Sequence, residues 1–279
     1  MTSSVEKTML RSLASSATAA MAPLARAASR APAAQPWSWD PKDTVGGPST
    51  WHATYCPGHA QSPIDIVKGD AVAVAGPALR LVPPTSGSVS GSVANTGNQI
   101  VLTPDADAKT SIVDGLFRGS PDDATFSLAN IHFHTPAEHA VDGVLADLEV
   151  HVVHQADNPD VDRFAVVGLL FNADDSAPES PLLSAILSAS EEYAEPLSEP
   201  TPLAVDAAAI TELVGDSPYY AYPGSLTTPP LTEAVSWLVI ANIHKAPAWQ
   251  IEQLTQIFPY PTNRPVQPVN DRVVNIVTP

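Results

Sequence analysis

The segment from residue 129 to residue 156 constrains the fold of this chain more than any other, because it carries two histidine-containing runs with strand-like alternation. His132 and His134 stand two apart in the first run, and His151 follows His134 by 17 positions in the second. Side chains two apart on a strand point to the same face of the sheet. If the two runs pair as neighbouring strands, three imidazole rings converge on one point. Three histidines with a fourth position left open are typical of catalytic zinc.

Each of these histidines, taken alone, could instead be an ordinary buried core residue. The clustering favours a metal site, because five of the eight histidines of the chain fall within 23 consecutive positions. They are His132, His134, His139, His151 and His154. A zinc-bound histidine normally donates its other ring N–H to a carboxylate or a carbonyl. Glu149 shares a strand face with His151 and is placed to accept that proton, while Glu138 is a second carboxylate within the segment.

The composition favours a β-rich fold with many loops. The 279 residues include 29 prolines and 14 glycines, with 6% aromatic residues, and the hydrophobic content of 44% is enough for a sizeable core. The net charge of −17 argues against nucleic acid as a partner, since phosphate binding requires a basic face. No run approaches the roughly 18 apolar residues of a transmembrane helix, so we predict no membrane span.

The first 36 residues differ in composition from the rest of the chain. They are rich in Ala, Ser and Arg and hold four basic residues against one acidic residue, so the remainder carries a net charge of −20. This composition is typical of an organelle transit peptide. The alternatives are a secretory signal, with residues 13–25 as its apolar region, and a disordered tail without a targeting role. We expect residues 1–36 to be a disordered or cleaved targeting segment and the protein to be exported from the cytosol, to a plastid, a mitochondrion, the periplasm or the exterior.

Three further groups of motifs accompany the histidine segment. Near the start of the folded part stand Trp37-Ser38-Trp39, residues 47–51 and residues 61–66; later follow residues 219–237, with Thr227-Thr228-Pro229-Pro230 at their centre, and residues 263–270. Read alone, these are turns, a short strand and a rigid loop. Together with the histidines they resemble the alpha-class carbonic anhydrases, in the form typical of bacterial and plant members. The resemblance covers residues 37–279 and implies one domain, mainly β with small peripheral helices (α+β), around a central, mostly antiparallel twisted sheet.

The resemblance implies a role for each residue of the metal site. His132, His134 and His151 would hold Zn²⁺, and Asn130 and Glu149 would accept hydrogen bonds from the ring N–H groups of His132 and His151. Asn130 stands where the family usually has glutamine, so its shorter side chain is expected to loosen that hydrogen bond.

The catalytic and pocket residues also follow from the resemblance. Thr227 would orient the hydroxide and donate its own proton to an ionised Glu138, whereas His139 and His154 match structural histidines. Asn98 stands where the family commonly has a proton-relay histidine, and an amide cannot titrate. The residues implied for the substrate pocket are Val153, Val166, Leu226, Thr228, Val235 and Trp237.

The residue pattern also predicts individual elements. We expect strands at 79–82, 88–93, 99–102, 124–128 and 163–171, and helices at 179–195, 206–214 and 249–258. We expect Asp206 to be the N-cap of the second helix. Cys56 is the single cysteine, so no intramolecular disulfide can form, and we expect a partly buried free thiol.

The predicted function is zinc-dependent, reversible hydration of carbon dioxide to bicarbonate and a proton by attack of zinc-bound hydroxide, which makes the protein a lyase. Two alternatives are a non-catalytic, carbonic-anhydrase-like binding or mineral-associated protein, and a zinc esterase that uses the same hydroxide on an acyl carbon. The presence of all three histidines, Thr227 and Glu138 favours the enzyme. The predicted partner is the small substrate, and no oligomeric state is predicted.

Overall fold

The fold is described from a computed structural model over residues 37–55, 58–112, 125–158, 163–188 and 199–279. Three predictions lie outside the described residues: the targeting segment 1–36, the thiol of Cys56, and the part of the helix 179–195 beyond residue 188.

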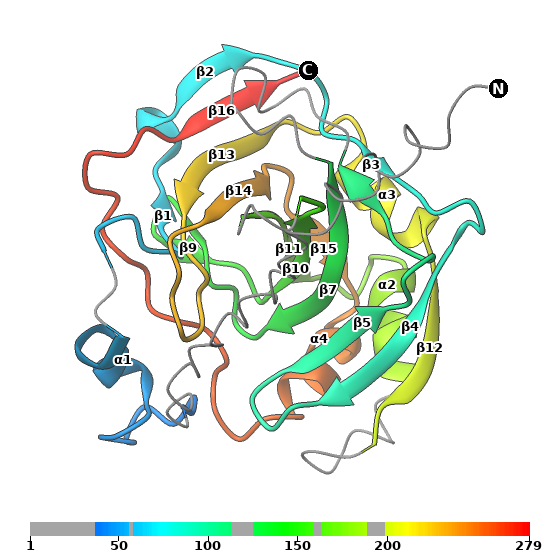
Figure 1. The fold of residues 1–279 in the computed structure, drawn as a ribbon, viewed down its shortest axis with the longest axis horizontal. Coiled ribbons are helices and arrows are strands. Elements are labelled where there is room, and N and C mark those ends of the chain that lie inside the picture. Colours follow the sequence, from blue (N-terminus) through cyan, green and yellow to red (C-terminus); the bar gives the residue numbers. More distant parts are fainter. Residues whose placement is uncertain (1–36, 56–57, 113–124, 159–162, 189–198) are drawn as a thin grey trace, which may run out of the picture. The chain divides into compact units, whose positions relative to one another are not determined.

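Strands make up most of the regular structure, as the composition indicates, and Figure 1 shows their arrangement. In chain order the elements are α1 (Pro48–Tyr55), β1 (Asp65–Ile66), the 3-10 helix η1 (Lys68–Asp70), β2 (Val72–Ala75), β3 (Leu81–Val82), β4 (Ser88–Asn95), β5 (Ile100–Pro104), β6 (Ser111–Ile112), β7 (Phe126–His134), β8 (Ala140–Val141), β9 (Val144–Leu145), β10 (Leu148–Ala156), β11 (Phe164–Ala173), α2 (Pro181–Ser188), β12 (Thr201–Asp206), α3 (Ala208–Val214), β13 (Tyr219–Gly224), β14 (Val235–Ile240), β15 (His244–Ala246), α4 (Ala248–Thr255) and β16 (Asn275–Thr278).

One large sheet organises the described part of the chain. Its strands follow the order β12-β4-β5-β7-β10-β11-β14-β13-β16-β2, with β15 beside β11 and with β6 joining β3 to β7. Most neighbours are antiparallel, and the parallel pairs are β11–β14, β11–β15 and β16–β2. The predicted mostly antiparallel sheet is therefore confirmed. A smaller sheet is formed by β1, β8 and β9.

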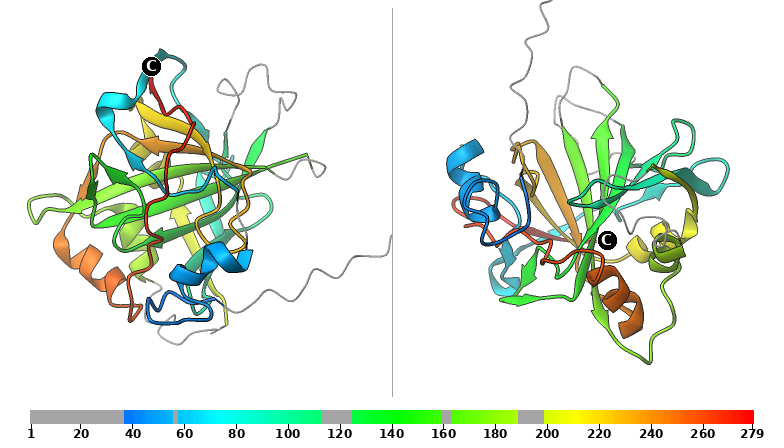
Figure 2. Two further views of the ribbon diagram at one scale, coloured as in Figure 1. Left: turned by 90° about the vertical axis from the view of Figure 1, so that its left-hand side faces the viewer. Right: turned by 90° about the horizontal axis from the view of Figure 1, so that it is seen from below.

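The central strands β10, β11 and β14 are buried on both faces, and alternate residues enter two different apolar clusters. In β10, Val150 and Val152 belong to one cluster and Val153 to the other. The first cluster also contains buried residues of α2 and α4, which lie together on one side of the sheet (Figure 2). The face that carries His151 is the opposite one, because neighbouring residues of a strand point to opposite faces. The two helices therefore support the sheet from behind the histidines.

The helix boundaries differ from the sequence prediction by a few residues. Helix α2 begins at Pro181 and buries the apolar residues at the predicted helical spacing, and α4 ends at Thr255. Helix α3 begins at Ala208, because Asp206 is still the last residue of β12, a strand that the sequence did not indicate. The predicted N-cap at Asp206 is therefore wrong: Ala207 is the N-cap of α3, and the Asp206 carboxylate accepts the N–H of Ala208 at 2.9 Å from the end of the strand. Among the described residues, no helix is both long and apolar enough to cross a membrane.

Candidate metal centre

The register of the central sheet brings the three predicted histidines together. His151 of β10 lies directly opposite His132 of β7, and His134 stands two residues further along the same face of β7. One ring nitrogen from each histidine lies within 4.8 Å of the others, and Nδ1 of His151 is 3.3 Å from Nε2 of His132. His134 and His151 are buried, whereas His132 is partly exposed. A single ion can therefore contact all three rings, with access from the side of His132.

Contacts on the outer nitrogens of His132 and His134 decide which nitrogen faces the centre. Nδ1 of His132 donates to Asn130 Oδ1 at 2.8 Å, and Nδ1 of His134 donates to the carbonyl oxygen of Thr262. In both rings the lone pair is then on Nε2. The expected loosening at Asn130 is wrong, because 2.8 Å is an ordinary hydrogen-bond length. Asn130 and His132 share a face two residues apart on β7, so the short side chain reaches the ring.

His151 is oriented the other way round, by a buried carboxylate. Its Nε2 donates to Glu149 Oε1 at 2.9 Å, which leaves Nδ1 for the centre. The same oxygen accepts from Nδ1 of His139 at 2.7 Å, and Oε2 accepts the backbone N–H groups of Glu138 and His139 at 2.9 and 2.8 Å. Burial alone would raise the pKa of Glu149, but electrostatic interactions and hydrogen bonds with His139 and His151 hold it well below its usual range. Glu149 is therefore an anionic acceptor.

The residues present fit a zinc ion. Burial lowers the pKa of all three histidines, that of His134 to about 4, so the rings are neutral and their lone pairs are available. Nε2 of His134 is buried and has no hydrogen-bond partner among the described residues. A buried polar atom without a partner is costly, and an ion at the centre would supply one. Three neutral imidazoles suit a catalytic zinc ion, whose fourth ligand comes from solvent or substrate.

Glu138 and Thr227 lie beside this centre, as the resemblance implies. Glu138 is fully buried, its Oε1 accepts the backbone N–H of Arg264 at 2.8 Å, and its Oε2 is 3.5 Å from Nε2 of His134. Burial raises the pKa of Glu138 to about 7, against hydrogen bonds from Thr227 and Arg264 that lower it. A dication at the centre would lower this pKa further, because opposite charge favours the carboxylate. The Thr227 hydroxyl then has an anionic acceptor for its proton.

The predicted pocket residues form an apolar wall next to His151. Val153, Val166 and Trp237 are cross-strand neighbours on β10, β11 and β14, and the Trp237 ring lies 4.8 Å from that of His151. Val235 and Leu226 belong to or pack against the same apolar cluster. Thr228, the remaining predicted pocket residue, is partly exposed.

His139 and His154, predicted to be structural, have both ring nitrogens engaged away from the centre. Nε2 of His139 contacts the Tyr222 hydroxyl at 2.6 Å, while its Nδ1 bonds to Glu149. His154 contacts the Thr110 hydroxyl and the Val152 carbonyl, both at 3.1 Å.

Asn98, at the position of the family's proton relay, holds the start of the described chain. Its side-chain amide donates to the Trp37 carbonyl at 3.0 Å, and its backbone carbonyl accepts the indole N–H of Trp39 at 2.8 Å. The Trp39 ring in turn lies edge-on to His134 at 5.8 Å. Asn98 therefore contacts the metal centre only indirectly, through Trp39.

Sequence reasoning missed the contribution of Thr262. Besides its carbonyl contact with His134, its hydroxyl accepts the backbone N–H of Thr135 at 3.0 Å. Thr262 directly precedes the closing motif 263–270, whose Arg264 also contacts Glu138. The motif itself was the available signal, although nothing in its composition indicates which histidine it serves.

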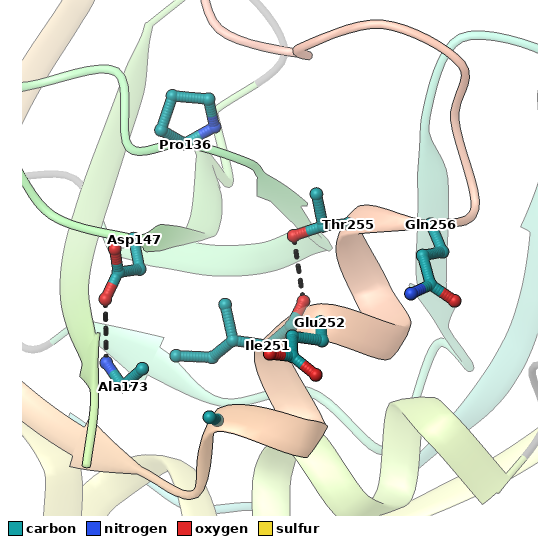
Figure 3. A pocket seen from close by; sticks show the side chains of 8 residues that line it. Pro136, Asp147, Ala173, Ile251, Glu252, Thr255 and Gln256 are labelled. Atoms are coloured by element: carbon teal, nitrogen blue, oxygen red, sulfur yellow. Dashed lines mark hydrogen bonds between the residues drawn. The ribbon is translucent and has the colours of Figure 1, made fainter.

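A separate pocket of about 420 Å³ lies beside α4 (Figure 3). It is lined by Pro136, Asp147, Ala173, Ala248, Ile251, Glu252, Thr255 and Gln256. Two of its polar side chains serve the backbone: Asp147 accepts the N–H of Ala173 at 2.8 Å, and Thr255 donates to the Ile251 carbonyl at 2.8 Å (Figure 3). This pocket contains none of the histidines, so the candidate site remains the metal centre.

The buried histidines make the metal-free protein sensitive to acid. The folded-state pKa values of His134 and His154 are about 4, and those of His132 and His151 are also lowered, so below pH 6.5 the unfolded chain binds more protons than the folded one. Stability therefore falls as the pH falls from 6.5 towards 4, by about 1.4 kcal/mol per pH unit for each fully buried histidine. Glu138, whose pKa is raised to about 7, instead stabilises the folded state as the pH falls. It is a single group, whereas four histidines contribute to the loss of stability.

Denaturant unfolding of zinc-free protein at pH 7, 6 and 5 tests this prediction. We expect the free energy of unfolding to fall at each step towards lower pH. It should fall less per pH unit in His154→Gln, because that variant lacks one titrating group. Equal stability across the range would contradict the neutral state of the buried histidines.

Comparison with known proteins gives the family. A sequence profile of the eukaryotic-type carbonic anhydrases matches residues 46–278. A carbonic anhydrase of Pectobacterium atrosepticum is 36% identical over 153 residues, which are 55% of this chain and 59% of that protein. The match therefore spans about three fifths of that bacterial relative. Alpha carbonic anhydrase 7 of Arabidopsis thaliana is 30% identical over 227 residues, 80% of this chain and 76% of that protein.

A solved structure shares the fold. The alpha-carbonic anhydrase from Thermovibrio ammonificans, in complex with the inhibitor sulfanilamide, has a TM-score of 0.71 at 28% identity, over 86% of this chain and 98% of that one. The resemblance inferred from the motifs is thereby confirmed: the chain belongs to the eukaryotic-type carbonic anhydrase family.

Proposed function

We propose that this protein reversibly hydrates carbon dioxide to bicarbonate and a proton, with Zn²⁺ held by Nε2 of His132, Nε2 of His134 and Nδ1 of His151. The observation that carries the proposal is the convergence of these three nitrogens, each freed for the metal by a hydrogen bond on the other side of its ring. Such outer contacts fix the orientation of metal-binding histidines and raise their basicity.

The chemistry that zinc supplies when bound is a lowered pKa of a coordinated water, from 15.7 to about 7, so that hydroxide is available at neutral pH. Thr227 directs this nucleophile. Its hydroxyl would donate a hydrogen bond to Glu138, which leaves the lone pairs on Oγ1 to accept a hydrogen bond from the attacking oxygen. Only one lone pair of the nucleophile then faces the substrate, and correct orientation of reactants is a large part of catalysis.

The apolar wall suits carbon dioxide, which has no net dipole. Val153, Val166 and Trp237 offer it an apolar surface beside the attacking oxygen and place no hydrogen-bonding group there that carbon dioxide would leave unpaired. The indole N–H of Trp237 is already donated to the Ser225 carbonyl at 3.0 Å.

The intact pair of Thr227 and Glu138 disfavours a non-catalytic binding protein. A buried carboxylate whose pKa is raised by burial, beside a hydroxyl and three neutral imidazoles, is typical of a catalytic site. Hydrolysis of small esters would use the same groups and is expected only as a side activity.

Metal content and carbon dioxide hydration, measured together on the full chain, test the proposal. We expect about one zinc per chain, loss of hydration when a chelator removes it, and recovery when zinc is returned. If the protein binds zinc stoichiometrically but hydrates carbon dioxide no faster than buffer does, the proposal is wrong and the non-catalytic binding protein is favoured.

Proton export gives a prediction at Asn98. The variant Asn98→His should hydrate carbon dioxide faster than wild type in dilute buffer, where removal of the proton limits turnover, and equally fast in concentrated buffer. Loss of the contact with the Trp37 carbonyl should cost about 1 kcal/mol of stability. Stopped-flow assays at two buffer concentrations measure this, and equal rates in dilute buffer would mean that protons leave by another route.

A further inference from the structure

Gly168 lies in the middle of β11, a largely buried strand, directly opposite the metal-site residue His151. In β11 it is paired with His151 of β10 on one side and with Val239 of β14 on the other. Its backbone does not have the positive φ that would require glycine. A glycine within a strand sacrifices packing and marks a site where another group comes close.

The group that comes close is the carboxylate of Glu149. A Cβ atom at position 168 would lie 2.9 Å from Oε1 of Glu149, a distance that real Cβ atoms essentially never show, and 3.4 Å from Cγ2 of Val239. Oε1 is the oxygen that accepts from Nε2 of His151 and from Nδ1 of His139.

The carboxylate cannot easily move aside to make room. Its other oxygen, Oε2, accepts the backbone N–H groups of Glu138 and His139, so any displacement stretches contacts at both oxygens. Glu149 and His139 are fully buried, so no water is at hand to replace a lost partner. A side chain at 168 would therefore act on the hydrogen bond to His151.

We propose that Gly168 is a positioning residue of the metal centre: the missing Cβ leaves the space in which Glu149 Oε1 binds Nε2 of His151 and thereby holds Nδ1 towards the other two histidines. This inference rests on the proposed zinc site. It assigns a function to a residue that does not touch the metal, the substrate or the reacting atoms.

The first test is zinc affinity, measured by competition with a chromophoric chelator. Gly168→Ala should weaken zinc binding about 10- to 100-fold, the usual cost of losing an outer contact of a metal ligand. In a Glu149→Ala background the same substitution should have little further effect, because the carboxylate with which it collides is gone. Equal fold-losses in both backgrounds, or no loss in either, would overturn the inference.

The second test observes the histidine rings directly. In spectra of zinc-loaded protein with ¹⁵N-labelled histidine, Gly168→Ala should shift or abolish the ring N–H signals of His151 and His139. The N–H signal of His132, which is donated to Asn130, should stay in place. A substitution that only loosens packing would not separate these signals in this way.

Gly91→Ala is the matched control. Gly91 lies in β4, where an added Cβ would meet the Thr103 carbonyl oxygen at 2.2 Å, so the substitution disturbs the sheet through the backbone and not through Glu149. It should lower the melting temperature and leave zinc affinity as in wild type. If Gly91→Ala weakened zinc as much as Gly168→Ala, general destabilisation would account for both, and the inference would fail.

Two outcomes remain to be separated. If Gly168→Ala does not fold, the double variant Gly168→Ala/Glu149→Ala should fold. If the double variant does not fold either, the added methyl group collides with another residue, such as Val239, and the inference is wrong. If wild type binds zinc and hydrates carbon dioxide while Gly168→Ala binds zinc as tightly, only this inference fails. Absence of zinc from wild type would instead refute the proposed function.

Discussion

We expect His151→Ala to abolish zinc binding and carbon dioxide hydration together. Two histidines then remain where three neutral imidazoles are needed, and the loss of affinity should exceed the roughly 10- to 100-fold cost of losing an outer contact. The substitution also leaves Glu149 Oε1 with one partner instead of two inside a fully buried network. Zinc content by atomic spectroscopy and hydration by stopped flow, on the same preparation, measure both effects.

His154→Ala is the matched control for this variant. His154 is buried in the same strand, three residues later, but its contacts are to Thr110 and Val152. It should lose stability and keep both zinc and activity. Full zinc occupancy in His151→Ala would refute the assignment of this ligand, and loss of zinc in both variants would mean that the strand, not the ring, is needed.

The metal centre could be predicted from sequence because local rules decide it. Two histidines at i and i+2 of one strand share a face, and pairing with the next run in the chain brings His151 opposite His132. Within the large sheet these two antiparallel strands follow one another along the chain, because β8 and β9, which lie between them in sequence, belong to the smaller sheet. The register shift between Val153 and His154 falls after the ligand, so it does not disturb the alignment.

Contacts between distant segments could not be predicted in this way. Thr262 meets His134 across 128 positions, and Asn98 meets Trp37 across 61. Neither contact leaves a periodic pattern in the sequence. The edge strand β2 was missed for a related reason: every one of its residues is exposed, so burial does not impose alternation on it.

Gly168 shows how a correct strand assignment can hide a function. The run 163–171 was predicted as a buried central strand, and β11 confirms it. In that reading glycine is one more small residue. Only the register, which sets Gly168 beside His151, and the place of the Glu149 carboxylate show what its missing side chain allows.

Thr227→Ala should keep zinc and lose most of the turnover. Thr227 is buried and contacts Glu138, and none of the three metal-facing nitrogens depends on its hydroxyl. Without the hydroxyl, nothing fixes which lone pair of the nucleophile faces carbon dioxide, and such misplacement costs on the order of 100-fold in rate. The pKa of Glu138 should also rise further, because the hydrogen bond from Thr227 lowers it.

The conservative variant Thr227→Ser separates orientation from packing, since it restores the hydroxyl and lacks only the methyl group. We expect it to recover most of the activity, while Glu138→Gln should resemble Thr227→Ala, because a neutral amide is a poorer acceptor for the hydroxyl proton than a carboxylate. Zinc content should equal that of wild type in Thr227→Ala and Thr227→Ser. In the proposed mechanism Glu138 acts on the attacking oxygen only through the Thr227 hydroxyl. Wild-type turnover in Thr227→Ala would therefore show that Thr227 and Glu138 do not orient the nucleophile.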